Sequence, residues 1–179
     1  MGEQVYLRSL QEPDIGDEYL SWLNDPEVTR YLETGNSTAT LASLRDYLKR
    51  FEGSSADLIF AIVDRGTDTH IGNVTLNHIS PVHLTTATGL LIGRKEFWGK
   101  GIAFEAWSLV IEYAFQSLGM RKVVAGVVAE HAPSVKTLKK LGFQVEGTFR
   151  KEVLVDGEFR DKLSLGMFRE EFHKFATGS

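Results

Sequence analysis

The chain has 179 residues, of which 42% are hydrophobic and 25% charged, and its formal net charge is −4. This length predicts one domain with a full core over residues 1–179, and the acidic balance excludes a broad basic surface for nucleic acid. The chain has no cysteine, which excludes disulfides, thiolate metal sites and a cysteine nucleophile. Neither a signal peptide nor a run of roughly 20 apolar residues is visible, so a cytoplasmic protein that does not enter the membrane is expected.

The first part of the chain predicts one strand and two helices. Residues 5–10 alternate loosely as a strand does. A helix is expected from residues 12–14 to residues 24–26, where Pro26 cannot continue the backbone ladder. Thr38 or Thr40 then caps a second helix with an apolar stripe.

The middle of the chain predicts three neighbouring antiparallel strands, over residues 58–63, 70–79 and 85–94. A long helix follows and ends at Gly119. Residues 122–129 are apolar on both faces, as in a central strand, so the connection across the long helix is a parallel crossover.

The last part predicts a short helix and a hairpin. Pro133 and Ser134 open the helix, and Gly142 ends it. Asp156-Gly157 is a hairpin signal between two strands within residues 143–168. The polar tail from residue 170 to 179 is expected to fray. The predicted fold class is therefore α+β (α/β mixed), with a central mixed and largely antiparallel sheet flanked by helices on both faces.

A loop with two glycines lies between the strand of residues 85–94 and the long helix. Gly99 and Gly101 have no Cβ, so the backbone can take unusual angles and approach a ligand closely. Such a loop at the start of a helix is suited to holding phosphate oxygens, although a plain strand-to-helix turn has the same composition. The loop is neither a Walker A element nor a dinucleotide fingerprint.

Residues 92–106, with the sequence Ile-Gly-Arg-Lys-Glu-Phe-Trp-Gly-Lys-Gly-Ile-Ala-Phe-Glu-Ala, resemble the acetyl-CoA motif of the GNAT acetyltransferases. The branch that they most resemble contains ribosomal-protein N-terminal, polyamine and amino-sugar acetyltransferases. Residues 22–28, 71–73 and 140–147 are similar to further segments of that branch, in the same order. The resemblance covers nearly the whole chain and implies a GNAT-like fold with acetyl-CoA as the acyl donor.

The resemblance also implies where acetyl-CoA binds. The loop from Gly99 to Ala103 would receive the pyrophosphate, and the strand through Leu91, Ile92 and Gly93 would hydrogen-bond the pantetheine arm through its backbone. One N–H group of that strand would act as the oxyanion donor, and residues 122–129 would splay away to leave a slot. The full set of implied donor-binding residues is Leu91, Ile92, Gly93, Trp98, Gly99, Lys100, Gly101, Ile102, Ala103, His131 and Ser134.

Three departures from the family pattern bear on catalysis. Trp98 stands where Gln or Arg is common, and His131 stands where Asn is common. Leu138 occupies the position of a tyrosine that protonates the departing thiolate, so Ser134, one helical turn earlier, or water would take that role.

The strand of residues 85–94 has no carboxylate, so the base is expected elsewhere. Glu33, His78 and His83 are the candidates, although each is also an ordinary loop or strand-end residue. No histidine pair has metal-ligand spacing with a third partner, so no metal is expected.

The predicted function is acetyl-CoA-dependent N-acetylation of a primary amine by direct transfer. A nucleotide-linked amino sugar is the first choice of acceptor, because Arg30 or Arg94 could meet its anionic group. Protein N-terminal amines come second and polyamines third. The candidate acceptor-binding residues are Trp22, Arg30, Tyr31, Glu33 and His78. A GNAT-like module that binds CoA without transfer is the alternative of another class, and the branch resemblance leaves a homodimer open.

Overall fold

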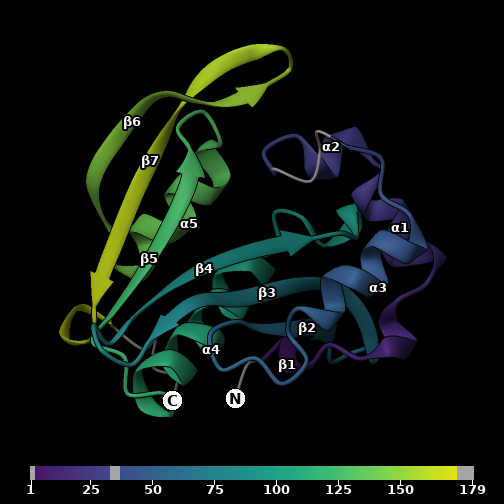
Figure 1. The fold of residues 1–179 in the computed structure, drawn as a ribbon, viewed down its shortest axis with the longest axis horizontal. Coiled ribbons are helices and arrows are strands. Elements are labelled where there is room, and N and C mark those ends of the chain that lie inside the picture. Colours follow the sequence, from purple (N-terminus) through teal and green to yellow (C-terminus); the bar gives the residue numbers. More distant parts are fainter. Residues whose placement is uncertain (1–2, 33–36, 173–179) are drawn as a thin grey trace.

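The computed structural model describes residues 3–32 and 37–172. Its centre is a seven-stranded sheet in the order β1-β2-β3-β4-β5-β7-β6 (Figure 1). Every pair of neighbouring strands in this sheet is antiparallel except β4 and β5, which are parallel. The strands are β1 (Val5–Ser9), β2 (Leu58–Asp64), β3 (Thr69–Ser80), β4 (Thr85–Ile92), β5 (Lys122–Val128), β6 (Gln144–Val155) and β7 (Glu158–Phe168). The predicted α+β class with a mixed, largely antiparallel sheet is confirmed.

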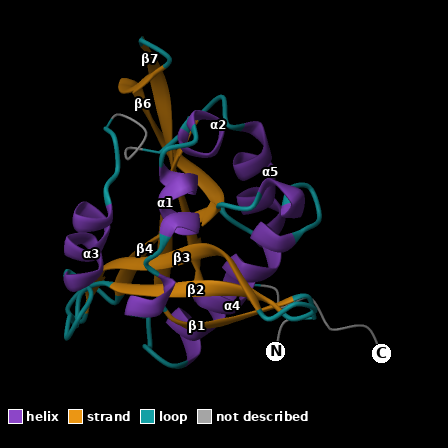
Figure 2. Ribbon diagram, turned by 90° about the vertical axis from the view of Figure 1, so that its right-hand side faces the viewer, coloured by secondary structure: helices purple, strands orange, loops and turns teal. Residues whose placement is uncertain are grey.

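Helices cover both faces of the sheet, as expected (Figures 1 and 2). One buried apolar cluster joins α4 and α5 to one face, and a second joins α1 and α3 to the other. The helices are α1 (Asp17–Leu23), α2 (Pro26–Thr29), α3 (Leu41–Lys49), α4 (Ile102–Gln116) and α5 (Ala132–Leu141), with short 3-10 turns η1 (Glu12–Asp14), η3 (Lys95–Phe97) and η4 (Arg169–Glu171). None of the helices in the described residues is long and apolar enough to cross a membrane.

Local signals set several of these boundaries. Of the two predicted caps, Thr40 begins α3, because its hydroxyl accepts a hydrogen bond from the backbone N–H of Ser43. Gly142 ends α5 in the left-handed conformation, with φ 108°. Asp156 and Gly157 also have positive φ, 50° and 79°, as a tight two-residue hairpin requires.

Three predicted boundaries near the chain ends differ in the structure. The helix expected from residue 12 is divided into η1 and α1, because Gly16 lies between them in extended conformation as the N-cap of α1. Pro26 does not only end a helix: it is the first residue of α2, where proline fits, and Asp25 caps it by accepting from the N–H of Glu27. The tail was expected to fray from residue 170, but residues 170 and 171 belong to the ordered turn η4. Residues 173–179 lie outside the described part.

Candidate active site

A gap between β4 and β5 is the central feature of the site. The two strands pair over three residues only, from Thr85↔Lys122 to Ala87↔Val124. Beyond that point β4 continues beside β3, whereas β5 continues beside β7, and the two strands diverge (Figure 1). This divergence is the splay that the family resemblance implies, and it leaves backbone groups on both strands without a strand partner.

The register of β4 shows which backbone groups face the gap. The N–H of Gly93 donates to the carbonyl of Ile71 on the β3 side, at 2.9 Å. In an antiparallel pair the backbone groups of successive residues point alternately to the partner strand and away from it. The N–H groups of Leu90 and Ile92 therefore face the gap, whereas those of Leu91 and Gly93 face β3. Of the three strand residues expected to bind the pantetheine arm, only Ile92 has its N–H on the gap side, and Leu90, which was not among the expected residues, has the other.

The glycine loop lies at the end of this gap and has the geometry of an anion site. Gly99 and Gly101 have φ of 73° and 82°, a conformation that strongly favours glycine. Gly101 is the N-cap of α4, and its carbonyl accepts the first intrahelical hydrogen bond, from Glu105 N–H. Ile102 and Ala103 come before Glu105 in the first turn of α4, so their N–H groups have no acceptor within the helix. A Cβ built on Gly99 would meet no atom within 4 Å, so the loop is open at this point.

Two side chains hold the loop in place. Trp98, expected to contact the cofactor, donates from its indole N–H to the carbonyl of Ile92 at 2.9 Å and so ties the loop to the end of β4. Glu105, in the first turn of α4, accepts from the N–H groups of Gln4 and Val5 at 2.9 and 3.1 Å. The start of α4 is thereby attached to both β4 and the start of β1.

Tyr31, His131 and Ser134 come together although they are distant in the chain. The rings of Tyr31 and His131 stack with centroids 4.4 Å apart. Ser134 Oγ lies 3.4 Å from His131 Nε2, within the first turn of α5. Nearby, Arg30 pairs with Asp156 at the tip of the β6–β7 hairpin, at 2.7 Å. These contacts join the segment after α2 to the β5 side of the gap.

The other predicted site residues lie elsewhere. Trp22 is only 5% exposed, and a Cβ built on Gly93 would fall 2.0 Å from its ring, so Trp22 is a core residue packed against the end of β4. His78 is exposed near the end of β3, at the register shift with β4, and its backbone N–H donates to Asp57. The structure does not bring it together with Tyr31 or Ser134. Glu33 lies outside the described residues.

A row of polar side chains on β3 lies outside the set of predicted site residues. Asn73, Thr75 and Asn77 alternate with the buried Val74 and Leu76, so they share the face opposite α4. The period-two pattern of polar residues in an apolar strand was the available signal.

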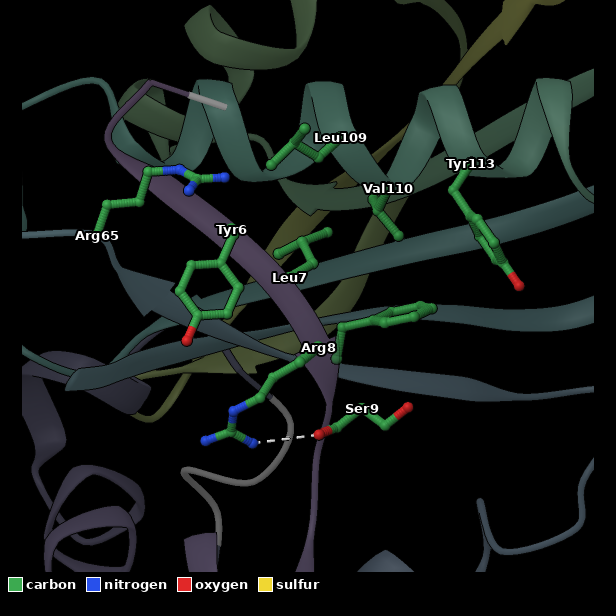
Figure 3. Close-up of a pocket in the computed structure, with 9 residues that line it drawn as sticks. Tyr6, Leu7, Arg8, Ser9, Arg65, Leu109, Val110 and Tyr113 are labelled. Carbon is green, nitrogen blue, oxygen red and sulfur yellow. Dashed lines mark hydrogen bonds between the residues drawn. The ribbon is translucent and has the colours of Figure 1, made fainter. Parts of the chain in front are cut away.

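An open groove of about 730 Å³ lies away from the gap, between β1 and α4 (Figure 3). Its lining includes Tyr6, Phe60, Leu109 and Tyr113 but none of the predicted site residues. The groove is therefore separate from the glycine loop.

Two half-buried histidines predict how stability depends on pH. Burial lowers the pKa of His70 and of His131 below the ordinary value of 6.5. At His70 it outweighs the hydrogen bond to Asn73 and the charge of Asp14, which both raise that pKa. As the pH falls through 6.5, the unfolded chain therefore binds more protons than the folded chain. The contribution that the neutral histidines make to the free energy of unfolding is present above this pH and is lost below it.

We expect the free energy of unfolding in urea to fall when the pH is lowered from about 7.5 to about 5.5. His70→Gln, which keeps an N–H donor for the carbonyl of Gly72 and does not titrate, should make this fall smaller. His83→Gln, at an exposed position, is the matched control and should not. An equal loss in all three proteins would show that the burial of His70 does not drive the effect.

Comparison with known proteins decides the family. Residues 4–144 match the model of the acetyltransferase (GNAT) domain family. The chain is a GNAT acetyltransferase. The family and the enzyme class expected from the sequence, with acetyl-CoA as the acyl donor, are confirmed.

Relatives cover nearly the whole of this acetyltransferase. It is 31% identical to the spermidine N(1)-acetyltransferase of Escherichia coli (strain K12), over 94% of this chain and 88% of the relative. It is 34% identical to the probable N-acetyltransferase YjcK of Bacillus subtilis (strain 168), over 95% and 97% of the two chains. In fold it is similar to the spermidine N-acetyltransferase of Vibrio cholerae in complex with CoA and spermine, with a TM-score of 0.85, 22% identity and coverage of 94% and 97%.

Proposed function

We propose that this GNAT acetyltransferase transfers the acetyl group of acetyl-CoA to a primary amine of a small polyamine. The observation that carries the proposal is the 31% identity, over 94% of the chain, to a spermidine N(1)-acetyltransferase. A polyamine, expected only as the third choice of acceptor, therefore replaces the nucleotide-linked amino sugar, which these relatives do not support.

The surroundings of the two arginines agree with a cationic acceptor. Arg30 and Arg94 were expected to meet an anionic sugar nucleotide. Arg30 pairs with Asp156, and Arg94 pairs with Glu18 at 2.5 Å and with Glu96 at 3.5 Å. Because carboxylates already neutralise both guanidinium groups, neither presents a free positive charge to an anion.

The glycine loop fits the pyrophosphate of acetyl-CoA. Open space at Gly99, left-handed backbone at Gly101 and the N–H groups of Ile102 and Ala103 are the features that such an anion needs. The exposed Lys100 adds a positive charge beside them. In this proposal the arm of the cofactor lies in the gap, against the backbone of Leu90 and Ile92.

The gap also supplies what acyl transfer requires. The amine nitrogen forms a bond to the acyl carbon, the C–S bond breaks, and the sulfur leaves as a thiolate. An N–H group of Leu90 or Ile92 stabilises the negative charge that develops on the carbonyl oxygen. Ser134 can donate a proton to the thiolate, and the amine loses its own proton to solvent. Burial keeps the pKa of His131 low, so the ring beside Ser134 is neutral near pH 7 and able to pass a proton on.

A panel assay tests the proposed function. The purified protein is incubated with acetyl-CoA and with spermidine, a peptide with a free N-terminus, or a nucleotide-linked amino sugar, and CoA release is measured. We expect turnover with spermidine to exceed turnover with the other two. Preferential acetylation of the peptide or the sugar would overturn the polyamine assignment. A calorimetric titration with acetyl-CoA is run in parallel, and failure to bind would overturn the placement of the donor.

A further inference from the structure

Asn77 and Thr75 form a hydrogen-bonded pair beside the point where the gap opens. Asn77 Nδ2 donates to Thr75 Oγ1 at 2.7 Å, and Thr75 Oγ1 donates in turn to the carbonyl of Gly89 through a long contact of 3.5 Å. We assign the amide with Nδ2 toward Thr75, because Thr75 Oγ1 then keeps its contact with the carbonyl of Gly89. Within the described residues, no group donates a hydrogen bond to Asn77 Oδ1. A half-buried carbonyl oxygen is therefore left to accept one.

The register places this side chain at the end of the gap where β4 and β5 part, on the strand next to β4. Asn77 lies opposite Ala87, the last residue of β4 that pairs with β5. Ala87 has no functional group beyond its Cβ, so nothing on β4 competes with the amide at this point. A register shift follows directly after Asn77, and His78 takes a φ of 53° there. Irregularities of this kind re-aim side chains and are frequent beside active sites.

The acceptor must reach the gap on the face that carries Asn77. The glycine loop leads into α4, and α4 and α5 cover the opposite face of the sheet. On the Asn77 face, Ala87 and Gly89 do not belong to the cluster buried under α1 and α3, and both are half-buried only. Within the described residues, neither is therefore packed into the apolar cluster that α1 and α3 bury.

We infer that Asn77 orients the acceptor amine, accepting an N–H hydrogen bond at Oδ1, while Thr75 holds the amide in position. This inference rests on the proposed function. It explains how a β4 without a carboxylate can still direct an amine: the polar group comes from the neighbouring strand. The neutral amide takes no proton, so Asn77 contributes to acceptor affinity rather than to deprotonation.

The test compares steady-state constants for the two substrates in Asn77→Ala and Asn77→Asp. Loss of a hydrogen bond to a charged or strongly polar donor should raise the acceptor KM of Asn77→Ala about tenfold. The KM for acetyl-CoA should stay within about twofold, because the donor contacts other residues. Asn77→Asp keeps an acceptor oxygen and should restore the acceptor KM. Thr75→Val should give a smaller increase than Asn77→Ala, with Thr69→Val, at the other end of the same strand, as the matched control that gives none.

Each outcome bears on the inference separately from the proposed function. The acceptor used is whichever amine the wild-type protein acetylates best, so a different preferred amine overturns only the polyamine assignment. An unchanged acceptor KM in Asn77→Ala, or an equal rise in both KM values together with a lower melting temperature, overturns the role of Asn77. Absence of turnover by the wild-type protein with every amine overturns both.

Discussion

Gly101→Val should raise the KM for acetyl-CoA about tenfold or more, because a β-branched residue at φ 82° is strained and the N–H groups around it must reorient. The space around the new Cβ is not the cause, since its nearest neighbour is Gln4 Nε2 at 3.9 Å. The effect therefore reports the backbone conformation of the loop. Acetyl-CoA titration calorimetry and initial-rate kinetics measure it.

Gly119→Val is the matched control for this change. Gly119 also has a positive φ, 69°, and a Cβ there would meet no atom within 4 Å, but it lies beyond the other end of α4. The two variants should lose similar stability, of about 1–3 kcal/mol, while only Gly101→Val weakens donor binding. If both variants bind acetyl-CoA as the wild-type protein does, the loop does not hold the pyrophosphate.

Trp22→Ala should destabilise the protein by about 3–5 kcal/mol, because it empties a buried site between α1 and the sheet. Trp22 packs on Gly93 and lies with its ring centroid 5.0 Å from that of His70 and 5.5 Å from that of Tyr19. The expected fall in melting temperature is on the order of 10 °C. Thermal unfolding followed by circular dichroism measures it.

The same variant separates the two roles considered for Trp22. A residue of the acceptor pocket would change the acceptor KM and leave the melting temperature nearly unaltered. Trp98→Ala, at a position that is 39% exposed, is the matched tryptophan control and should cost much less stability. Gly93→Ala adds a further check, because its Cβ would overlap the indole ring of Trp22. It should lower the free energy of unfolding more in the wild-type background than in the Trp22→Ala background.

Features set by neighbouring residues could be predicted from the sequence. The cap at Thr40, the end of α5 at Gly142 and the hairpin turn at Asp156-Gly157 each depend on a few adjacent residues, and each is found in the structure. The glycine loop belongs to this class as well. The four-residue helix α2 does not show an apolar period, and Pro26 is equally compatible with the end of one helix and the start of the next.

Features set by pairing between distant residues could not be predicted. Which N–H groups of β4 face the gap depends on the register with β3, and a shift of one residue would exchange Ile92 for Gly93. The contact between Tyr31 and His131 likewise depends on how α2 lies relative to α5. For the same reason, the burial of Trp22 against Gly93 was not visible from the helical spacing of either segment.

The attachment of Glu105 to Gln4 and Val5 has a consequence for the order of folding. These hydrogen bonds join residues 101 and 100 positions apart, so the start of α4 reaches its final orientation only after β1 has docked beside β2. Contacts of such long sequence separation form late, since the loop-closure entropy must be overcome first. Acetyl-CoA would therefore bind only after Glu105 has met Gln4 and Val5. Acetyl-CoA would then stabilise the complete native state over every partly folded form, rather than the glycine loop alone.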